Sequence, residues 1–271
     1  MDFRRIQILL IIFFALFNIY LTYQIYEKIN TNPQIANIES DQDVQEQLAN
    51  RGISLEVDLS ADRVELPVIL SDPNTLTSSQ LSDLVYQDAE LEDGIIESQF
   101  DKAIPLRLDS KVNQKLLEQI QREFIANEDY FLNGHEYQMY QYLPANKQLV
   151  FWQKLDDSGP ILDQTGEIRL FLNNNYEVEG YRQTYQGNVS VLAEKRVAIS
   201  KEEALYVLDQ RLETHLPADS TILNMDMGYH RFVALDDSNI YFPAWKILYE
   251  QPDGTIHAEL IDGVKRQVVT R

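Results

Sequence analysis

The sequence of 271 residues contains no cysteine. Disulfides, thiolate metal sites and cysteine nucleophiles are therefore excluded, and any folded domain depends on its core alone for stability. An exported domain without disulfides also fits bacteria that lack a strongly oxidising periplasm.

Motifs of common enzyme and metal sites are absent as well. The four histidines stand singly, without the spacing that places two ligands on one helix face, which favours structural or surface roles. No Gly-x-Ser-x-Gly motif occurs, no serine precedes a lysine by three positions, and no glycine cluster could bind a phosphate. The sequence therefore predicts no catalytic residue, no cofactor and no metal site.

Adjacent acidic residues leave one catalytic alternative open, because carboxylate pairs carry out glycoside hydrolysis. Such pairs occur at Asp156-Asp157 and Asp236-Asp237, and Glu90 lies close to Glu92 and Asp93. All of them lie in loop-like segments, and nothing in the sequence indicates the apolar pocket that would raise the pKa of one carboxyl. A solvated surface is the favoured interpretation.

Positive charge is scarce. Asp and Glu number 43 against 23 Lys and Arg, which gives a net charge of −20. Nucleic acid, anionic lipid headgroups and polyanionic wall polymers would be repelled, so the composition disfavours all three as direct ligands.

One long apolar segment, residues 6–26, follows a short basic N-terminus, residues 1–5. About twenty mainly apolar positions at ~1.5 Å per residue match the ~30 Å hydrocarbon core of a bilayer. Arg4 and Arg5 place the N-terminus in the cytoplasm and the acidic remainder outside. No small-residue cleavage site follows, which favours a retained anchor over a cleaved signal peptide. We expect a single-pass protein of the cell membrane with an extracytoplasmic C-terminal domain.

Polar residues inside this segment are candidates for contact with another helix in the bilayer. Gln7, Asn18 and Thr22 fall close to one line along a helix, together with Ile11 and Phe14. A polar side chain in lipid gains from bonding to a neighbouring helix, although Gln7 and Thr22 can equally lie in the membrane interfaces. Asn18 is deep enough to be the strongest candidate.

The hydrophobic patterns predict an α+β ectodomain of two units, each an antiparallel sheet packed with a helix. Residues 27–40 read as a tether. The first unit, residues 41–187, contains a helix at 111–126 and a meander of strands at 135–185, which we expect to pack against each other.

The second unit covers residues 188–271. Ser200 and Glu203 form a capping box at the start of a helix that runs to about residue 216. Strands follow, and Asp253-Gly254 and Asp262-Gly263 are expected hairpin turns, because glycine accepts the positive φ that such turns need.

Three local predictions concern the first unit. Pro67 places the strand at residues 64–70 on a sheet edge, because proline donates no hydrogen bond. The polar stretch at residues 71–94 reads as a loop, with a short helix after Thr77. Asp109-Ser110 is expected to cap the helix that follows.

The chain resembles the YycI (WalI) family, and order and spacing match from end to end. The motifs mark a fold and carry over no active-site residue; the closing strands also resemble half of a PepSY module. The segments that carry the resemblance are MDFRRIQ running into the apolar span, NGHEYQMYQYLP, LVFWQKLDD, GPILDQTGEIRLFLNNN, YRQTYQG, EKRVAISKEEAL, GYHRF and YFPAWKI.

The resemblance implies a regulator without enzymatic activity in a two-component system that controls cell-wall metabolism in Gram-positive bacteria. Its implied partners are a YycG/WalK-like sensor histidine kinase, reached through the membrane span, and a YycH-like protein. The sign of the effect on the kinase stays open. The alternatives are an extracytoplasmic protein that binds or hydrolyses wall glycan, and a PepSY-like protease inhibitor.

Overall fold

The computed structural model divides the chain into two compact units, Met1–Asp43 and Val44–Arg271. Among the described residues, no helix is both long and apolar enough to cross a bilayer. Most of the predicted anchor, residues 6–26, and all of the predicted tether, residues 27–40, lie outside the described residues. The described residues are 10, 13, 14, 17, 18, 20, 41–73, 75–108, 113–155, 159–210 and 216–269.

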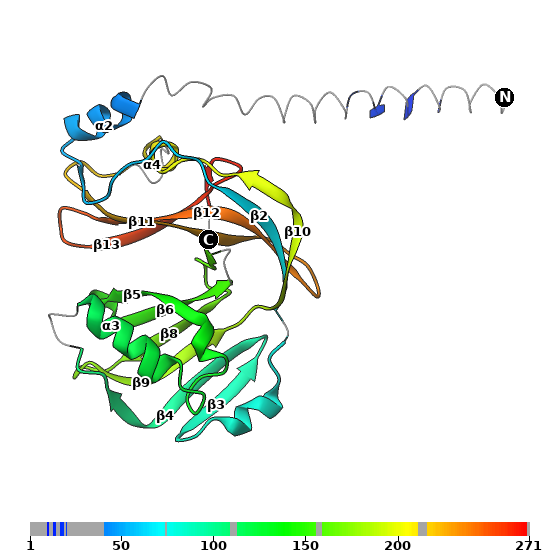
Figure 1. Ribbon diagram of the computed structural model, residues 1–271, viewed down its shortest axis with the longest axis vertical. Helices are drawn as coiled ribbons and strands as arrows, with labels where there is room; N and C mark the ends of the chain where they lie inside the picture. Colours follow the sequence, from blue (N-terminus) through cyan, green and yellow to red (C-terminus); the bar gives the residue numbers. More distant parts are fainter. Residues whose placement is uncertain are drawn as a thin grey trace. The chain divides into compact units, whose positions relative to one another are not determined.

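The unit Val44–Arg271 contains two mainly antiparallel sheets (Figure 1). We call the first the central sheet, because its strands come from the middle of the chain. Its strand order is β3-β4-β9-β8-β6-β5, with the short β7 paired to β6. The strands are β3 (Gln87–Glu92), β4 (Ile95–Pro105), β5 (Tyr137–Leu143), β6 (Gln148–Leu155), β7 (Gly159–Pro160), β8 (Glu167–Leu172) and β9 (Glu177–Thr184).

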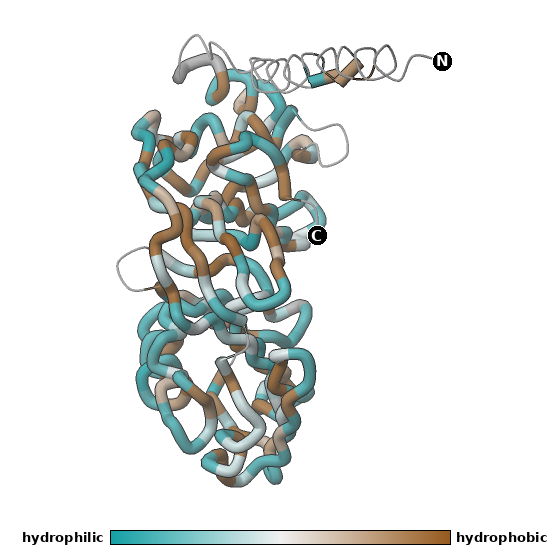
Figure 2. The backbone as a smooth tube through the Cα atoms, turned by 90° about the vertical axis from the view of Figure 1, so that its right-hand side faces the viewer, coloured by the Kyte–Doolittle hydropathy of each residue, from teal (hydrophilic) through white to brown (hydrophobic). Residues whose placement is uncertain are grey.

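The second sheet, called the terminal sheet, joins strands from both ends of the unit. Its strand order is β1-β11-β12-β13-β14, and β2 pairs with both β10 and β12. The strands are β1 (Ser54–Leu55), β2 (Glu65–Asp72), β10 (Gly187–Val197), β11 (Thr221–Ala234), β12 (Asn239–Glu250), β13 (Ile256–Asp262) and β14 (Gln267–Val268). Apolar residues concentrate in the strands of both sheets (Figure 2).

The central sheet packs against helix α3 (Gln114–Ile120), which continues as a π-helical turn to Ile125. Ile168 and Leu170 of β8 face this helix and are fully buried. Phe171, on the opposite face of the strand, is 40% exposed. This alternation is what a sheet with one buried face requires, so the predicted packing of helix on meander is confirmed.

Helix α4 (Lys201–Asp209) contacts β12, β13 and β14 of the terminal sheet. The predicted capping box is confirmed: Ser200 Oγ accepts from Glu203 N at 3.1 Å, and Glu203 Oε2 accepts from Ser200 N at 3.0 Å. The helix ends earlier than the predicted residue 216, and residues 211–215 lie outside the described residues.

The α+β class with two sheets agrees with the prediction, but the sheet membership of residues 54–72 does not. These residues were expected in the first unit, residues 41–187. Instead β2 pairs antiparallel with β10, with Asp72 opposite Gly187, and the whole central sheet lies between these two strands in the sequence. Residues Val44–Arg271 form one compact unit. The division of this part of the chain at residue 187 stays a prediction.

Pro67 does not place all of β2 at an edge. Residues 69 and 70 pair with β12 as well as β10, whereas the part of the strand that holds Pro67 pairs with β10 alone. A residue without an N–H is tolerated there because one side of the strand forms no ladder.

The stretch at residues 71–94 is more ordered than predicted. It contains the expected short helix, a 3-10 helix at Ser78–Asp83, and also strand β3. The strand was missed because its exposed face is entirely acidic and only Ala89 and Leu91 are apolar on its half-buried face.

The predicted helix cap and the two predicted hairpin turns have different outcomes. Asp109 and Ser110 lie outside the described residues, and the described helix cap is Asn113, whose side chain accepts from Leu116 N at 3.0 Å. The turn at Gly254 has the predicted positive φ of 82°. At Asp262-Gly263 the positive φ belongs to Arg266, because the Asp262 carboxylate accepts from the backbone of residues 264 and 265 and shapes the turn.

Candidate functional sites

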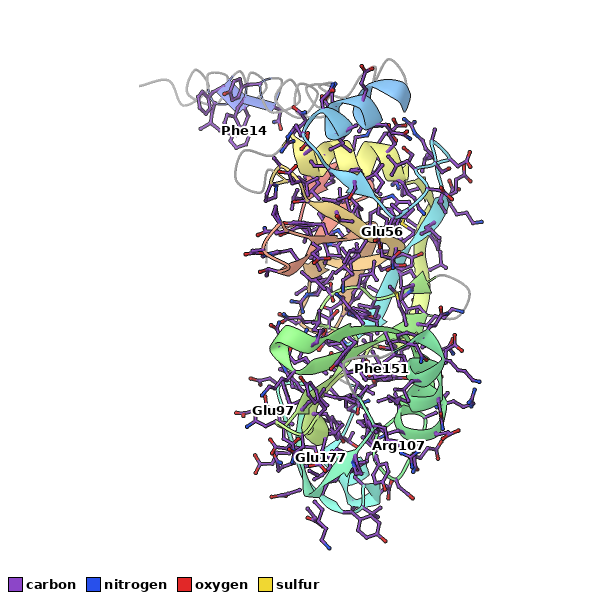
Figure 3. The ribbon with its side chains drawn as sticks, turned by 90° about the vertical axis from the view of Figure 1, so that its left-hand side faces the viewer. Phe14, Glu56, Glu97, Arg107, Phe151 and Glu177 are labelled. Carbon is purple, nitrogen blue, oxygen red and sulfur yellow. The ribbon has the colours of Figure 1, made fainter. Side chains whose placement is uncertain are left out.

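Of the five residues predicted to contact a partner helix, Phe14 and Asn18 are described, whereas Gln7, Ile11 and Thr22 lie outside the described residues. Phe14 and Asn18 are both helical, and Phe14 is 58% exposed (Figure 3). Asn18 Nδ2 donates to the Phe14 carbonyl at 2.9 Å, within its own helix. Contact with another helix stays a prediction.

The acidic pairs considered for catalysis lie at the surface where they are described. Asp236 and Asp237 are exposed in the turn between β11 and β12, and Glu90 is exposed on β3 opposite Glu97 of β4. Asp156-Asp157 lies outside the described residues. Exposed carboxylates lack the apolar surroundings that raise the pKa of a catalytic acid. Within the described residues, no group of three or more His, Asp or Glu side chains could hold a metal ion.

The segment at residues 159–165 connects the two sheets. Its first residues form β7 beside β6 of the central sheet, and Ile161 N donates to Gln153 O at 2.9 Å. Ile161 also bridges in parallel to Tyr229 of β11, and Leu162 N donates to the Tyr229 carbonyl at 2.8 Å. The backbone itself therefore fixes how the two sheets meet.

A buried glutamine completes this junction. Gln186 is 3% exposed and lies immediately before β10. Its Oε1 accepts from Ser71 Oγ at 2.8 Å and from Asn239 Nδ2 at 3.0 Å. Its Nε2 donates to Thr165 O at 2.8 Å, and its backbone N donates to Gln153 Oε1 at 2.9 Å. A satisfied polar network of this kind specifies one arrangement of the elements that it joins.

A cavity of about 330 Å³ lies where the sheets meet, and we call it the inter-sheet cavity. Trp152 of β6 and Lys246 of β12 line it, with the Lys246 Nζ only 3.2 Å from the centroid of the indole ring. Leu162 and Leu260 add apolar wall, while Arg231 of β11 adds a further cation.

Both carboxylates that line this cavity are engaged by neighbouring groups. Glu167 accepts from Arg169 Nε at 2.8 Å and from its Nη2 at 3.0 Å. Asp163 accepts from Thr165 N at 2.9 Å and from the backbone N of Arg231 at 2.5 Å. These contacts hold both carboxylates in place, and the guanidinium of Arg169 offsets the charge of Glu167.

Asp226 is the acidic neighbour of Lys246 across the β11–β12 pair. Burial raises the pKa of Asp226, and Asn224 and the positive charges of Lys246 and Lys201 offset part of that rise. The terminal sheet therefore carries a partly buried pair of opposite charges beside the cavity.

Strand β10 presents a second surface. Among the described strands it pairs only with β2, and it exposes four apolar side chains. Three register shifts against β2 interrupt its edge, and such bulges hinder the addition of another strand. Its surface is therefore better suited to side-chain contacts than to strand pairing. The exposed apolar residues are Val189, Val191, Leu192 and Val197.

The inter-sheet cavity was not predicted from the sequence, although two of the quoted motifs contain residues that line it. Trp152 belongs to LVFWQKLDD and Lys246 to YFPAWKI. The contact joins strands of different sheets, so no spacing in the sequence could reveal it. Figure 3 shows the neighbouring Phe151 inside the unit, where it is fully buried, and Glu97 at the surface.

Two of the solved structures that are similar to this chain cover most of its length. An uncharacterized protein from Eubacterium rectale has a TM-score of 0.46 at 10% identity, over 87% of this chain and 100% of its own. The YpeB C-terminal domain from Bacillus megaterium has a TM-score of 0.35 at 11% identity, over 86% of this chain and 97% of its own. Both scores are too low to support conclusions about this protein. No curated protein matches the sequence.

The model of the family described as YycI protein matches residues 32–263. The match covers the whole central sheet and all of the terminal sheet except β14. Membership supports a regulatory role in the YycG/WalK system. From this match, the chain belongs to the YycI family.

Proposed function

We propose that this protein is a membrane-anchored, non-enzymatic regulator that modulates the YycG/WalK-like sensor kinase together with a YycH-like protein. The family match over residues 32–263 is the observation that carries the proposal. The two sheets carry their described acidic pairs at the surface, which fits a protein that acts by binding other proteins rather than by catalysis.

The apolar segment at residues 6–26 acts as the anchor, with the N-terminus in the cytoplasm and the two sheets outside the membrane. The basic residues before it and the acidic body after it support this orientation. Asn18 lies deepest among its polar residues, and a side-chain contact between helices in lipid contributes ~0.6 to 2 kcal/mol. The span thereby favours one of two packings of the kinase's helices.

The exposed apolar side chains of β10 provide the contact with the YycH-like protein. Val191 is 66% exposed and Leu192 is 49% exposed, and grouped apolar residues at a surface are typical of protein-binding sites. The anchor and the ectodomain therefore contact different partners.

Replacing residues 1–28 with an unrelated membrane span tests the anchor. Co-purification with the kinase should be lost, while the chain still reaches the membrane. If the chimera binds and regulates fully, the contact lies in the ectodomain and this part of the proposal is wrong.

Photo-crosslinking from position 18 in cells identifies the neighbour directly. Position 13 serves as the matched control, because five residues rotate a helix by roughly 140°. We expect the kinase to be captured from position 18 and much less from position 13. Equal capture from both positions would contradict a directed contact.

Val191→Asp tests the β10 surface. A charge at the centre of an apolar contact should reduce co-purification of the YycH-like protein at least about tenfold, because burying an unpaired charge is costly. Ile256→Asp is the control, since Ile256 is 37% exposed on β13 rather than β10. Equal effects of the two substitutions would argue against β10 as the contact.

A further inference from the structure

We propose that strand β10 binds in a cleft of its protein partner, which contacts both faces of the strand and places acidic residues beside its basic end. The inference rests on the proposed function, which assigns β10 to the contact with the YycH-like protein, and it adds the form and the charge of the partner's surface. Three features of β10 carry it: the exposure of both faces, a group of apolar side chains, and two basic residues.

Strand β10 exposes both of its faces. Successive side chains of a strand point to opposite faces, so a strand that lies on a core has one buried face. In β10 the residues at 188–192 and 194–197 are all exposed, and only the first residue, Gly187, is buried. The neighbouring strand β2 buries Val68, Ile69 and Ser71. The body of the protein therefore covers β2 but leaves β10 open on each side.

The pairing with β2 identifies one residue on each face. Ser190 is opposite Leu70 and Val191 is opposite Ile69, and residues opposite each other in an antiparallel pair share a face. Because Ser190 and Val191 are consecutive and no register shift separates them, they point to opposite faces. Both are exposed on β10, which lies beside β2 in the terminal sheet (Figure 1).

Apolar side chains are grouped in the first half of β10. Val189, Val191 and Leu192 are 41%, 66% and 49% exposed. A partner surface that encloses the strand removes more of these side chains from water than a flat surface does, and burial of apolar area is the main favourable term in most protein associations. The strand therefore fits a cleft better than a plane.

The second half of β10 is basic in an otherwise acidic chain. Lys195 and Arg196 are exposed, and neither forms an ion pair with another described residue, although Glu194 adjoins them and Glu65 lies opposite Val197. The strand carries these two positive charges against one negative charge, whereas the whole chain has a net charge of −20. Carboxylates of a partner are therefore attracted to this end of β10, which fixes the orientation of the strand in the cleft.

Cysteine labelling tests the two faces, because the chain has no cysteine of its own. Full-length Ser190→Cys and Val191→Cys variants in nanodiscs are treated with a maleimide, with and without the YycH-like protein. We expect the partner to slow labelling at least about tenfold at both positions, because the core of an interface excludes water. Ser78→Cys is the control, since Ser78 is exposed on the 3-10 helix at Ser78–Asp83, and its labelling rate should not change.

The pattern of protection separates the inference from the proposed function. Protection of one position alone would mean a flat contact, which overturns the cleft and leaves the proposed function intact. Protection of neither position, with the partner bound, would remove β10 from the interface and overturn both assignments of the strand. Failure of the unchanged chain to bind the YycH-like protein would contradict the proposed function itself, and this inference with it.

A double substitution tests the acidic part of the cleft. Lys195→Met combined with Arg196→Met should weaken binding of the YycH-like protein severalfold at low salt, and should reduce the loss of affinity that added salt causes. Lys102→Met, at an exposed position on β4, is the control and should leave both quantities unchanged. If the double variant keeps the affinity and the salt dependence of the unchanged chain, the partner places no acidic residues beside Lys195 and Arg196.

Discussion

The ammonium group of Lys246 on β12 lies 3.2 Å from the ring centroid of Trp152 on β6, so a cation–π contact joins the terminal sheet to the central sheet. Both side chains are nearly buried. Such contacts contribute about 2 kcal/mol or more when they are desolvated. This contact therefore stabilises the junction of the two sheets as well as lining the cavity.

A double-mutant cycle measures this contact. Lys246→Met and Trp152→Leu should each destabilise the chain, and the double variant should lose about 1–2 kcal/mol less than the sum of the two, because either change alone removes the contact. Urea unfolding of the unchanged chain and the three variants, monitored by circular dichroism, gives the three changes in the free energy of unfolding. Strict additivity would mean that the ring and the ammonium group do not interact.

Gly228→Ala tests the backbone connection between the sheets. A Cβ at Gly228 would lie 2.3 Å from the Pro160 carbonyl oxygen and 2.8 Å from Leu162 Cγ, so the segment at residues 159–165 would have to move. We expect a loss of about 2–3 kcal/mol in the free energy of unfolding.

Gly254→Ala is the comparison for that change. Gly254 has a φ of 82°, and the nearest atom to an added Cβ is 3.8 Å away, so only the strain of the left-handed backbone should count, about 1–2 kcal/mol. If Gly228→Ala is no more destabilising than Gly254→Ala, the close approach of the connecting segment is not important for stability.

Glu203 makes stability depend on pH. Burial acts to raise the pKa of Glu203, but hydrogen bonds from Arg63 and from the Ser200 backbone, with the charge of Arg266, hold it below the ordinary 4.5. A carboxyl with a lowered folded-state pKa stabilises the fold above its unfolded-state pKa. That contribution is lost as the pH falls from about 4.5 through the lowered folded-state value.

Glu203→Gln should therefore lower the free energy of unfolding at neutral pH. The loss should be only about 1 kcal/mol, because Arg63 is half exposed and solvent screens its ion pair with Glu203. The difference from the unchanged chain should shrink as the pH falls below 4.5. Urea unfolding from pH 3 to pH 7 checks this, with Glu123→Gln, at an exposed ion pair, as the control. A difference that stays constant with pH would contradict the assignment.

Arg51 joins the end of helix α2 (Asp41–Asn50) to the end of helix α4. Its guanidinium donates to the Asp209 carboxylate and to the Leu216 carbonyl. Arg51→Met should destabilise the chain by about 2–3 kcal/mol, because it takes this cation away from a carboxylate that is only 6% exposed. Arg51→Lys should recover part of the loss, because it restores the positive charge. Recovery should be incomplete, because an ammonium group cannot form the two directed hydrogen bonds of the planar guanidinium.

Unfolding measurements on the two Arg51 variants separate charge from geometry. Full recovery by lysine would mean that charge alone matters, and no loss in either variant would mean that the contact between the helix ends contributes nothing to stability.

Several features of the fold could be predicted because they depend on neighbours in the chain. The capping box of Ser200 and Glu203 requires two residues three positions apart, and the turn at Gly254 requires one residue that accepts a positive φ. The buried face of β8 follows from simple alternation. Strand β3 was missed because acidic residues filled its outer face.

The sequence by itself determined the apolar N-terminal segment, the acidic surface, the absence of disulfides, the local elements and, through its motifs, the family. Only the tertiary structure decided that β2 pairs with β10 across the inserted central sheet, and that Lys246 meets Trp152. Backbone N–H and C=O groups are the same in every strand, so the choice of partner strand is not encoded in local pattern. It depends on how side chains distant in the sequence pack together, and therefore on the whole fold.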